Sequence, residues 1–179
     1  SRRQRQMCIR DSLLTAKPVI YVANLNDDME ETDGLKKLRE KANTNGSLVI
    51  EMCNQIEFEI SELENESKQE LIDLAGLDEP GLNKLIRSAF TTLGLQTFFT
   101  SGPKESRAWV IKSGTSAPEA AGVIHTDFKK GFIRAETVSF KDFIQFNGEQ
   151  GAKAQGKWRS EGSDYQVKDG DIILFRFNA

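Results

Sequence analysis

Histidine and cysteine are scarce in this sequence of 179 residues, and their scarcity excludes several classes of protein. A single histidine, His125, is too few for an ordinary zinc site. Two cysteines, Cys8 and Cys53, cannot form the framework of a disulfide-rich domain. No apolar run approaches the roughly 18 residues that a membrane-spanning helix needs, and no secretory signal opens the chain. We therefore expect a soluble, cytoplasmic protein.

The sequence also lacks a strong net charge. Its 24 Lys and Arg residues nearly balance 27 Asp and Glu residues, which excludes a strongly basic protein that coats nucleic acid along its whole length. The balance is uneven, because residues 1–95 carry 12 basic and 17 acidic side chains, whereas residues 96–179 carry 12 and 10. An acidic part followed by a mildly basic part is consistent with two domains that have different partners.

No motif for phosphate binding or nucleophilic catalysis is present. The sequence contains no Gly-x-x-x-x-Gly-Lys-Ser/Thr phosphate loop, no Ser-His-Asp arrangement around His125, and no Cys-His pair with a local signature. The acidic run at 55–70 is more typical of a solvated helix face than of catalytic carboxylates. By its own residues, the chain lacks a complete catalytic site.

The first half of the chain predicts an α/β arrangement. Residues 1–12 show no clean periodicity, and we expect a disordered or non-native arm that takes no part in the fold. The β-branched run 18–23 predicts a strand buried on both faces, residues 33–45 a helix with Asp33 as a possible N-cap, and residues 47–53 a second strand. This order predicts two parallel neighbouring strands.

A change in the sequence pattern near Leu95 predicts a domain boundary. Before it, residues 55–75 predict an acidic helix that breaks near Asn65, and residues 82–93 a second amphipathic helix. After it, short aromatic strands alternate with glycine-containing turns. Strands are expected at 95–100, 107–112, 131–135 and 171–177, with short helices at 118–124 and 140–146. Strands around one main helix predict a compact α+β domain.

The most informative short motif is the segment 24–27 (NLND), directly after the first predicted strand. Open α/β sheets bind ligands at the carboxyl ends of their strands, and an asparagine amide with a carboxylate three residues later can read the edge of a purine. A second polar loop at Cys53 and Asn54 follows the neighbouring strand, so the two loops would bracket one base. The alternative is a simple polar turn, since Asn and Asp are common in turns.

Basic and aromatic residues interleave in the second half. Lys129, Lys130 and Arg134 lie among phenylalanines, a pattern that fits RNA contacts and fits equally well cations whose stems cover a core. Arg107 shares a strand face with a tryptophan, for which a cation–π contact is the simplest interpretation. For His125, a locally hydrogen-bonded helix cap is favoured over a ligand or RNA contact.

Longer segments are more specific than these short motifs: 14–24 (LTAKPVIYVAN), 76–82 (GLDEPGL), 107–109 (RAW), 117–135 (APEAAGVIHTDFKKGFIRA), 148–153 (GEQGAK), 165–171 (YQVKDGD) and 175–178 (FRFN). Through these segments the sequence resembles the YchF, or Obg-like ATPase, family of P-loop NTPases over about residues 13–179.

The resemblance implies two domains. Residues 13–95 would be the C-terminal part of a Ras-like P-loop NTPase domain with an α/β fold, and residues 96–179 a TGS domain, an α+β module of the ubiquitin-like β-grasp type. The family binds and hydrolyses ATP, and GTP more weakly, with Mg²⁺. It associates with ribosomes and translation factors, which makes rRNA an expected partner and neither DNA nor a membrane one.

The resemblance also assigns a base-recognition motif, Asn-x-x-Glu, in place of the Asn-Lys-x-Asp of ordinary GTPases. Asn24 matches its first position, and Leu25 replaces the GTPase lysine. Asp27 departs from the family's glutamate and matches the GTPase residue, which leaves the preference between ATP and GTP open. Cys53 and Asn54 correspond to the loop that supplies backbone contacts to the base.

The resemblance leaves the catalytic activity of this chain uncertain. In the family, the phosphate loop, the Mg²⁺-binding residue and the switch segments precede the part that matches residue 13. Without them little positions a γ-phosphate, so we expect the chain alone to be inactive, to bind nucleotide weakly and to hold no metal. Two alternatives stay open: a non-catalytic TGS adaptor, and a fragment of a GTP-preferring GTPase.

Overall fold

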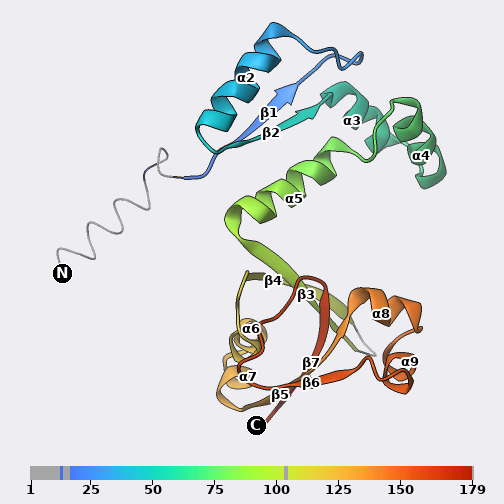
Figure 1. Ribbon diagram of the computed structural model, residues 1–179. Coiled ribbons are helices and arrows are strands. Elements are labelled where there is room, and N and C mark those ends of the chain that lie inside the picture. The colour runs from blue at the N-terminus through green and yellow to red at the C-terminus, as the bar shows by residue number, and fades with distance from the viewer. Residues whose placement is uncertain (1–12, 14–16, 103–104, 179) are drawn as a thin grey trace, which may run out of the picture. The chain divides into compact units, whose positions relative to one another are not determined.

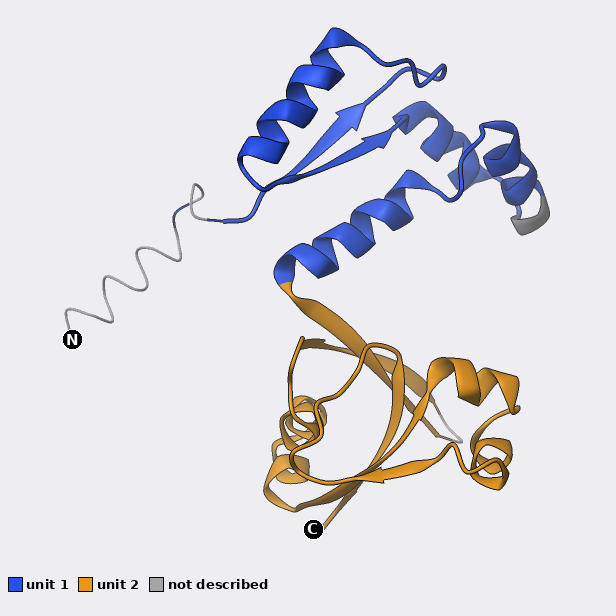
Figure 2. Ribbon diagram, in the orientation of Figure 1, with its two compact units in different colours: residues 1–93 blue, residues 94–179 orange. Residues whose placement is uncertain are grey.

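The computed structural model describes residues 13, 17–102 and 105–178. The N-terminal arm expected at 1–12, including Cys8, therefore lies outside the described residues. The chain divides into two compact units, residues 1–93 (unit 1) and residues 94–179 (unit 2), and each has its own β-sheet (Figure 2). Within the described residues, no helix is both long and apolar enough to cross a membrane.

Unit 1 begins with two strands joined through a helix (Figure 1). β1 (Ile20–Asn24) and β2 (Leu48–Met52) pair in parallel, and α2 (Asp33–Thr44) lies between them in sequence. The register places Asn24 opposite Met52, so both strands end at the same edge. The predicted order and the predicted parallel pairing are confirmed.

Two local predictions for unit 1 are wrong. The N-cap of α2 is Thr32, whose Oγ1 accepts the N–H of Leu35 at 3.2 Å, while Asp33 already lies in the first turn, where its charge suits the helix dipole. The strands are also not buried on both faces, because Val22 and Leu48 are each 45% exposed. An apolar run provides side chains that can be buried, but they become buried only where helices or other strands pack over both faces of the strand.

The remainder of unit 1 is helical. α3 (Asn54–Glu62) and α4 (Asn65–Leu74) confirm the predicted break near Asn65, and α5 (Gly81–Leu93) follows. α5 packs against β2. It ends at Gly94, whose φ of +62° is the left-handed conformation that glycine adopts without steric cost.

Unit 2 is built on a mixed five-stranded sheet in the order β4-β3-β7-β5-β6. β3 and β7 are parallel, and the other neighbouring strands are antiparallel. The strands are β3 (Leu95–Ser101), β4 (Ser106–Lys112), β5 (Phe132–Ser139), β6 (Arg159–Glu161) and β7 (Asp171–Phe177).

Helices cover both faces of this sheet (Figure 1). One face is covered by α6 (Ala117–Ile124) and α7 (Thr126–Lys130), the other by α8 (Phe140–Gln145) and α9 (Glu149–Ala154). Two adjacent residues of β7 show the division, because Ile173 packs with the alanines of α6 whereas Ile172 packs with Ala152 of α9. Side chains alternate along a strand, so unit 2 has a separate apolar core on each face.

Three elements of unit 2 escape the sequence analysis. α7 and β6 are too short to show a period, with five and three residues. α9 contains Gly151, a residue that disfavours helix. A Cβ at Gly151 would lie 1.7 Å from the carbonyl oxygen of Phe146, so the close approach of α9 to the end of α8 requires the glycine.

Candidate functional site

The two polar loops predicted to bracket a base meet at the end of the strand pair. The side-chain Oδ1 of Asn24, the last residue of β1, accepts the N–H of Asn54, the first residue of α3, at 3.0 Å. The N–H of Leu25 donates to the carbonyl oxygen of Met52 at 2.9 Å and extends the ladder beyond β1. The structure therefore brings the segment 24–27 and the start of α3 together at the carboxyl ends of two parallel strands.

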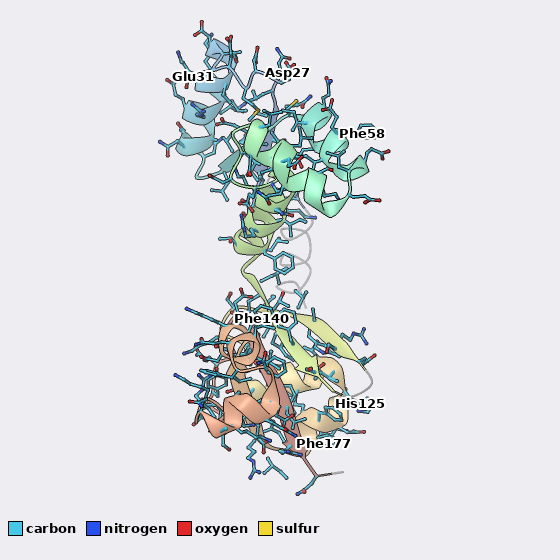
Figure 3. The ribbon with its side chains drawn as sticks, turned by 90° about the vertical axis from the view of Figure 1, so that its right-hand side faces the viewer. Asp27, Glu31, Phe58, His125, Phe140 and Phe177 are labelled. Carbon is cyan, nitrogen blue, oxygen red and sulfur yellow. The ribbon has the colours of Figure 1, made fainter. Side chains whose placement is uncertain are left out.

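Asp27 lies in a tight turn directly beyond this junction (Figure 3). The N–H of Met29 donates to the carbonyl oxygen of Asn26 at 3.1 Å, and Met29 has a positive φ of 51°. One carboxylate oxygen of Asp27 accepts the N–H of Asp28 at 3.1 Å, and the side chain is exposed. The turn therefore presents the Asp27 carboxylate to solvent three residues after Asn24.

Cys53 and Asn54 differ in what they can offer to a ligand. Cys53 is only 5% exposed, and as the N-cap of α3 it makes no side-chain capping hydrogen bond. Its thiol therefore belongs to the core of unit 1. Asn54 is exposed. A ligand at this edge of the sheet would meet the backbone of this loop and the side chain of Asn54.

Glu57, which sequence reasoning missed, connects the first turns of two helices. Its Oε1 accepts the N–H of Gly81 at 2.6 Å, and its Oε2 accepts the N–H of Leu82 at 3.2 Å. A Cβ at Gly81 would lie 2.7 Å from the Cβ of Met52, so only glycine allows α5 to begin this close to the end of β2. These two hydrogen bonds, called the Glu57 brace below, therefore hold the start of α5 against the first turn of α3, which carries Asn54. The sequence shows that the Pro-Gly start of α5 has no capping side chain of its own, but it does not identify Glu57 as the acceptor.

A second ionic contact steadies the segment after Asp27. Arg39 of α2 binds Glu51 of β2 in a bidentate way, from Nε to Oε1 at 2.7 Å and from Nη2 to Oε2 at 2.9 Å. Its Nη1 reaches Glu31, which precedes α2, at 2.6 Å. The hydrogen bonds to Glu51 raise the pKa of Arg39. Glu31 projects outward in unit 1 (Figure 3), so Arg39 ties an exposed segment back to β2.

The basic residues proposed to contact RNA do not form one patch. Arg107 stacks over Trp109, with its guanidinium carbon 4.3 Å from the ring centroid, as expected from their spacing. Trp109 packs against the core beneath α6, so Arg107 lies on that face of the sheet. Lys129 and Lys130 are exposed on α7, which covers the same face.

Arg134 lies on the other face. Its neighbour Ala135 is fully buried in the core beneath α6, and alternation along β5 turns Arg134 and Glu136 to the side of α8 and α9. Arg134 donates from Nη2 to Glu136 Oε1 at 3.0 Å. Arg176 of β7 donates from Nε to Oε1 at 3.2 Å and from Nη2 to Oε2 at 3.1 Å of the same carboxylate.

These hydrogen bonds make Glu136 the most perturbed carboxyl group in the described part of the chain. The bond from Arg176, together with those from Arg134 and Trp158, lowers the pKa of Glu136 to about 2 and outweighs the effect of burial. Trp158 donates from Nε1 to Oε2 at 3.4 Å. Because the residue is only 8% exposed, the pair of arginines holds an ionised carboxylate inside the unit.

His125 is a helix cap, which confirms the favoured interpretation. It ends α6 and begins α7, and its Nδ1 accepts the N–H of Asp127 at 3.3 Å. Its ring borders a shallow apolar pocket of about 560 Å³ with Phe128 and Phe177. His125 and Phe177 are labelled in unit 2 in Figure 3. Phe128 and Phe177 stack with ring centroids 3.9 Å apart.

The described residues contain no group of three or more His, Cys, Asp or Glu side chains that could hold a metal ion. Their architecture is that of an α/β protein with a mixed sheet. Its best candidate for a ligand-binding site is the junction of the two polar loops at the ends of the parallel strands.

Comparison with known proteins identifies homologues of this chain. Residues 95–178 match the family model YchF-GTPase_C, described as a protein of unknown function (DUF933). The "Ribosome-binding ATPase YchF" of Haemophilus influenzae is 54% identical over 168 residues, which are 93% of this chain and 46% of that protein. The "Obg-like ATPase 1" of Rattus norvegicus is 43% identical over 171 residues, 93% of this chain and 43% of that protein.

A solved structure agrees with this assignment. The YchF GTPase of Schizosaccharomyces pombe superposes with a TM-score of 0.81 at 32% sequence identity, covering 98% of this chain and 48% of that one. The chain is therefore a homologue of the YchF and Obg-like ATPases, as its sequence motifs indicate. It spans about half the length of the relatives that it matches.

Proposed function

We propose that this chain is part of a ribosome-associated protein that binds a purine nucleotide. One observation carries the proposal: the hydrogen bond from the N–H of Asn54 to Oδ1 of Asn24 joins both predicted base-binding loops at the ligand-binding edge of the sheet. The name of the Haemophilus influenzae relative, ribosome-binding ATPase, supports the same function.

In this proposal, residues 13–95 form the C-terminal part of a Ras-like P-loop NTPase domain. The Oδ1 atom of Asn24 is used within the protein, so its NH₂ group would donate to a ring nitrogen of the base. The exposed carboxylate of Asp27 would accept N–H groups from the base edge. Leu25 would lie where ordinary GTPases have a lysine, and the loop at Cys53 and Asn54 would supply backbone contacts.

The choice between ATP and GTP depends on Asp27. A guanine base offers two N–H donors to one carboxylate, and aspartate is the residue that GTPases use for this contact. Leu25 favours the ATP preference of the family. A GTP-preferring protein is therefore the second candidate, and Asp27 is the observation in its favour.

Phosphate and Mg²⁺ binding would come from residues that this chain does not have. Its sequence contains no Gly-x-x-x-x-Gly-Lys motif, and the described residues contain no metal-binding cluster. Since preorganised contacts to the γ-phosphate supply nearly all of the rate enhancement in phosphoryl transfer, the 179-residue chain by itself would not hydrolyse ATP and would bind it weakly.

Residues 96–179 would form a TGS module of the β-grasp type. The order β4-β3-β7-β5-β6, with its first and last strands parallel at the centre and α6 across one face, supports this. Such a module would contact ribosomal RNA or protein through exposed basic residues, for which Arg107, Lys129, Lys130 and Arg134 are candidates. A non-catalytic adaptor remains the alternative, because unit 2 has cores of its own.

A nucleotide titration followed by NMR tests the base site. Adding ATP or GTP to the ¹⁵N-labelled chain is expected to move the amide signals of Leu25, Asp27 and Asn54. Asn24→Ala should abolish these shifts, whereas Asn83→Ala, which removes an exposed asparagine from α5, should leave them unchanged. The proposal is wrong if neither nucleotide moves these signals at millimolar concentration. Larger effects with GTP than with ATP at equal concentration would favour the second candidate.

A phosphate-release assay tests the expected inactivity. Purified chain incubated with ATP and Mg²⁺ should release phosphate at the rate of the buffer control. Hydrolysis that rises in proportion to protein concentration and is lost in Asn24→Ala would contradict it.

A further inference from the structure

A buried carboxylate holds two arginines in fixed positions on the α8–α9 face of unit 2. The side chain of Glu136 is 11% exposed, whereas those of Arg134 and Arg176 are 52% and 47% exposed. The strand register places Arg134 directly opposite Arg176. Like charges in such a pair repel each other, so Glu136 offsets a repulsion that the strand pairing creates.

The geometry leaves part of each arginine free to bind something else. Both guanidinium groups contact Glu136 through Nε and Nη2. An arginine has five N–H donors in a rigid fork, and among the described residues the Nη1 group of each has no hydrogen-bond partner, so it can donate to a further acceptor. Side chains that are already ordered lose little entropy when they bind, which suits them to the recognition of oxyanions.

A third cation and an aromatic ring adjoin the arginines. The Nζ of Lys153 lies 5.0 Å from the ring centroid of Trp158, and Trp158 itself donates to Glu136. Beside Trp158, a groove of about 360 Å³ has Phe143 and Leu174 in its lining. Exposed cations, an aromatic ring and an apolar groove thus lie within one connected set of contacts.

We propose that this face, defined by Arg134, Arg176, Lys153 and Trp158, binds single-stranded RNA. The arginines and Lys153 would contact backbone phosphates, and the groove beside Trp158 would take one base. Single-stranded nucleic acids are bound by this combination of cations that follow the backbone and aromatic rings that contact bases. The inference rests on the proposed ribosome association and names three contact residues that sequence patterns did not indicate.

Charge and shape favour RNA over an acidic peptide. Two half-exposed arginines flank the buried Glu136, and half-exposed Lys153 is ion-paired with Glu149, the exposed acid that also lines the groove. The exposed part of the cluster is therefore positive. An acidic peptide would satisfy the cations, but only one with a correctly spaced aromatic residue would also fill the apolar groove beside Trp158, whereas every nucleotide of an RNA strand carries a flat base.

The test measures binding of a fluorescein-labelled oligouridine of about 16 nucleotides to the full chain by fluorescence anisotropy. Arg176→Gln is expected to weaken binding about tenfold, as the loss of one charged hydrogen-bonding group does. Lys153→Gln is expected to weaken it about threefold and to reduce the slope of log affinity against log salt by about one. Lys153 makes no contact with Glu136, so this second variant keeps the test valid if Arg176→Gln folds poorly.

Two control variants locate the effect. Lys41→Gln removes one charge from α2 of unit 1 and should leave oligouridine binding unchanged. Lys168→Gln removes an exposed charge from the turn before β7 and should also leave it unchanged. Arg107→Gln removes a charge from the opposite face of unit 2 and should weaken binding less than Arg176→Gln or Lys153→Gln does. Wild-type affinity in both Arg176→Gln and Lys153→Gln, or a loss confined to Arg107→Gln, would overturn the inference. Displacement of the RNA by polyglutamate at equal charge concentration would overturn it as well, in favour of an acidic protein partner.

Co-sedimentation with purified ribosomes separates this inference from the proposed function. If the wild-type chain sediments with ribosomes and both variants sediment equally well, the RNA face is wrong and the ribosome association stands. If the wild-type chain does not sediment with ribosomes, the association is wrong, and the oligouridine measurement decides the RNA face independently.

Discussion

Replacing Glu57 by alanine should destabilise unit 1 and leave unit 2 untouched. The substitution removes the acceptor of two N–H groups in the first turn of α5, one of them on buried Gly81. Loss of a helix cap costs about 1 kcal/mol, loss of a negative charge at a helix N-terminus a few tenths more, and an unsatisfied buried donor about 1 kcal/mol. Together these effects predict a loss of about 2 kcal/mol.

The distribution of chromophores makes the effect measurable in one sample. Both tryptophans of the chain, Trp109 and Trp158, belong to unit 2, so tryptophan fluorescence reports the unfolding of unit 2 alone. Far-UV circular dichroism is dominated by the long helices of unit 1. With a urea m-value of about 1 kcal/mol/M for a unit of this size, the dichroism midpoint should fall by about 2 M. The fluorescence midpoint should stay constant.

Two further variants define the result that would refute this reasoning. Glu57→Gln keeps an oxygen acceptor but loses the charge, so its midpoint should lie between those of Glu57→Ala and the wild type. Glu59→Gln changes an exposed glutamate of the same helix and should have no effect. If Glu57→Ala shifts the dichroism midpoint no more than Glu59→Gln does, or shifts both transitions equally, the brace contributes nothing.

Three more predictions follow from single contacts. Because the pKa of Glu136 is lowered to about 2 from an ordinary value of about 4.5, its ionised form stabilises unit 2 above pH ~4.5. About 1–2 kcal/mol should be lost as the pH falls towards 2, measured by urea unfolding with tryptophan fluorescence, and Glu136→Gln should remove this dependence. Gly151→Ala should shift the fluorescence transition by more than about 2 kcal/mol because its Cβ meets the carbonyl of Phe146, whereas Gly162→Ala, in open space, should not. Thr32→Ala should cost unit 1 about 1 kcal/mol in the dichroism transition, and an unchanged midpoint would show that another group caps α2.

Local signals predicted most of the regular structure. The order of β1, α2 and β2 follows from an apolar run, a capped amphipathic stretch and a second apolar run, and it fixes the parallel pairing by topology alone. α5 is predicted by one continuous apolar face that ends in a glycine. A helix of five residues and a strand of three are too short to show a repeating pattern of apolar residues, which explains why α7 and β6 were missed.

Part of the candidate base site could also be predicted from the sequence. The position of segment 24–27 after one strand, and of Cys53 and Asn54 after its neighbour, predicted that the two loops would meet at the carboxyl ends of the strands, as they do in the structure. The Glu57 brace could not be predicted from the sequence. The two N–H groups that donate to Glu57 are 24 and 25 residues away, and any residue type except proline would supply them.

The sequence alone indicated the homology with the YchF and Obg-like ATPases, the order of the main elements and the loops that meet at the end of the strand pair, because each depends on residues that are neighbours along the chain. Only the tertiary structure decided which charges act together. Strand alternation and register separate Arg134 from Arg107 and place it opposite Arg176, 42 positions further along, with Glu136 between them. Electrostatic energy depends on distance and burial in space, and neither quantity is encoded by position in the chain.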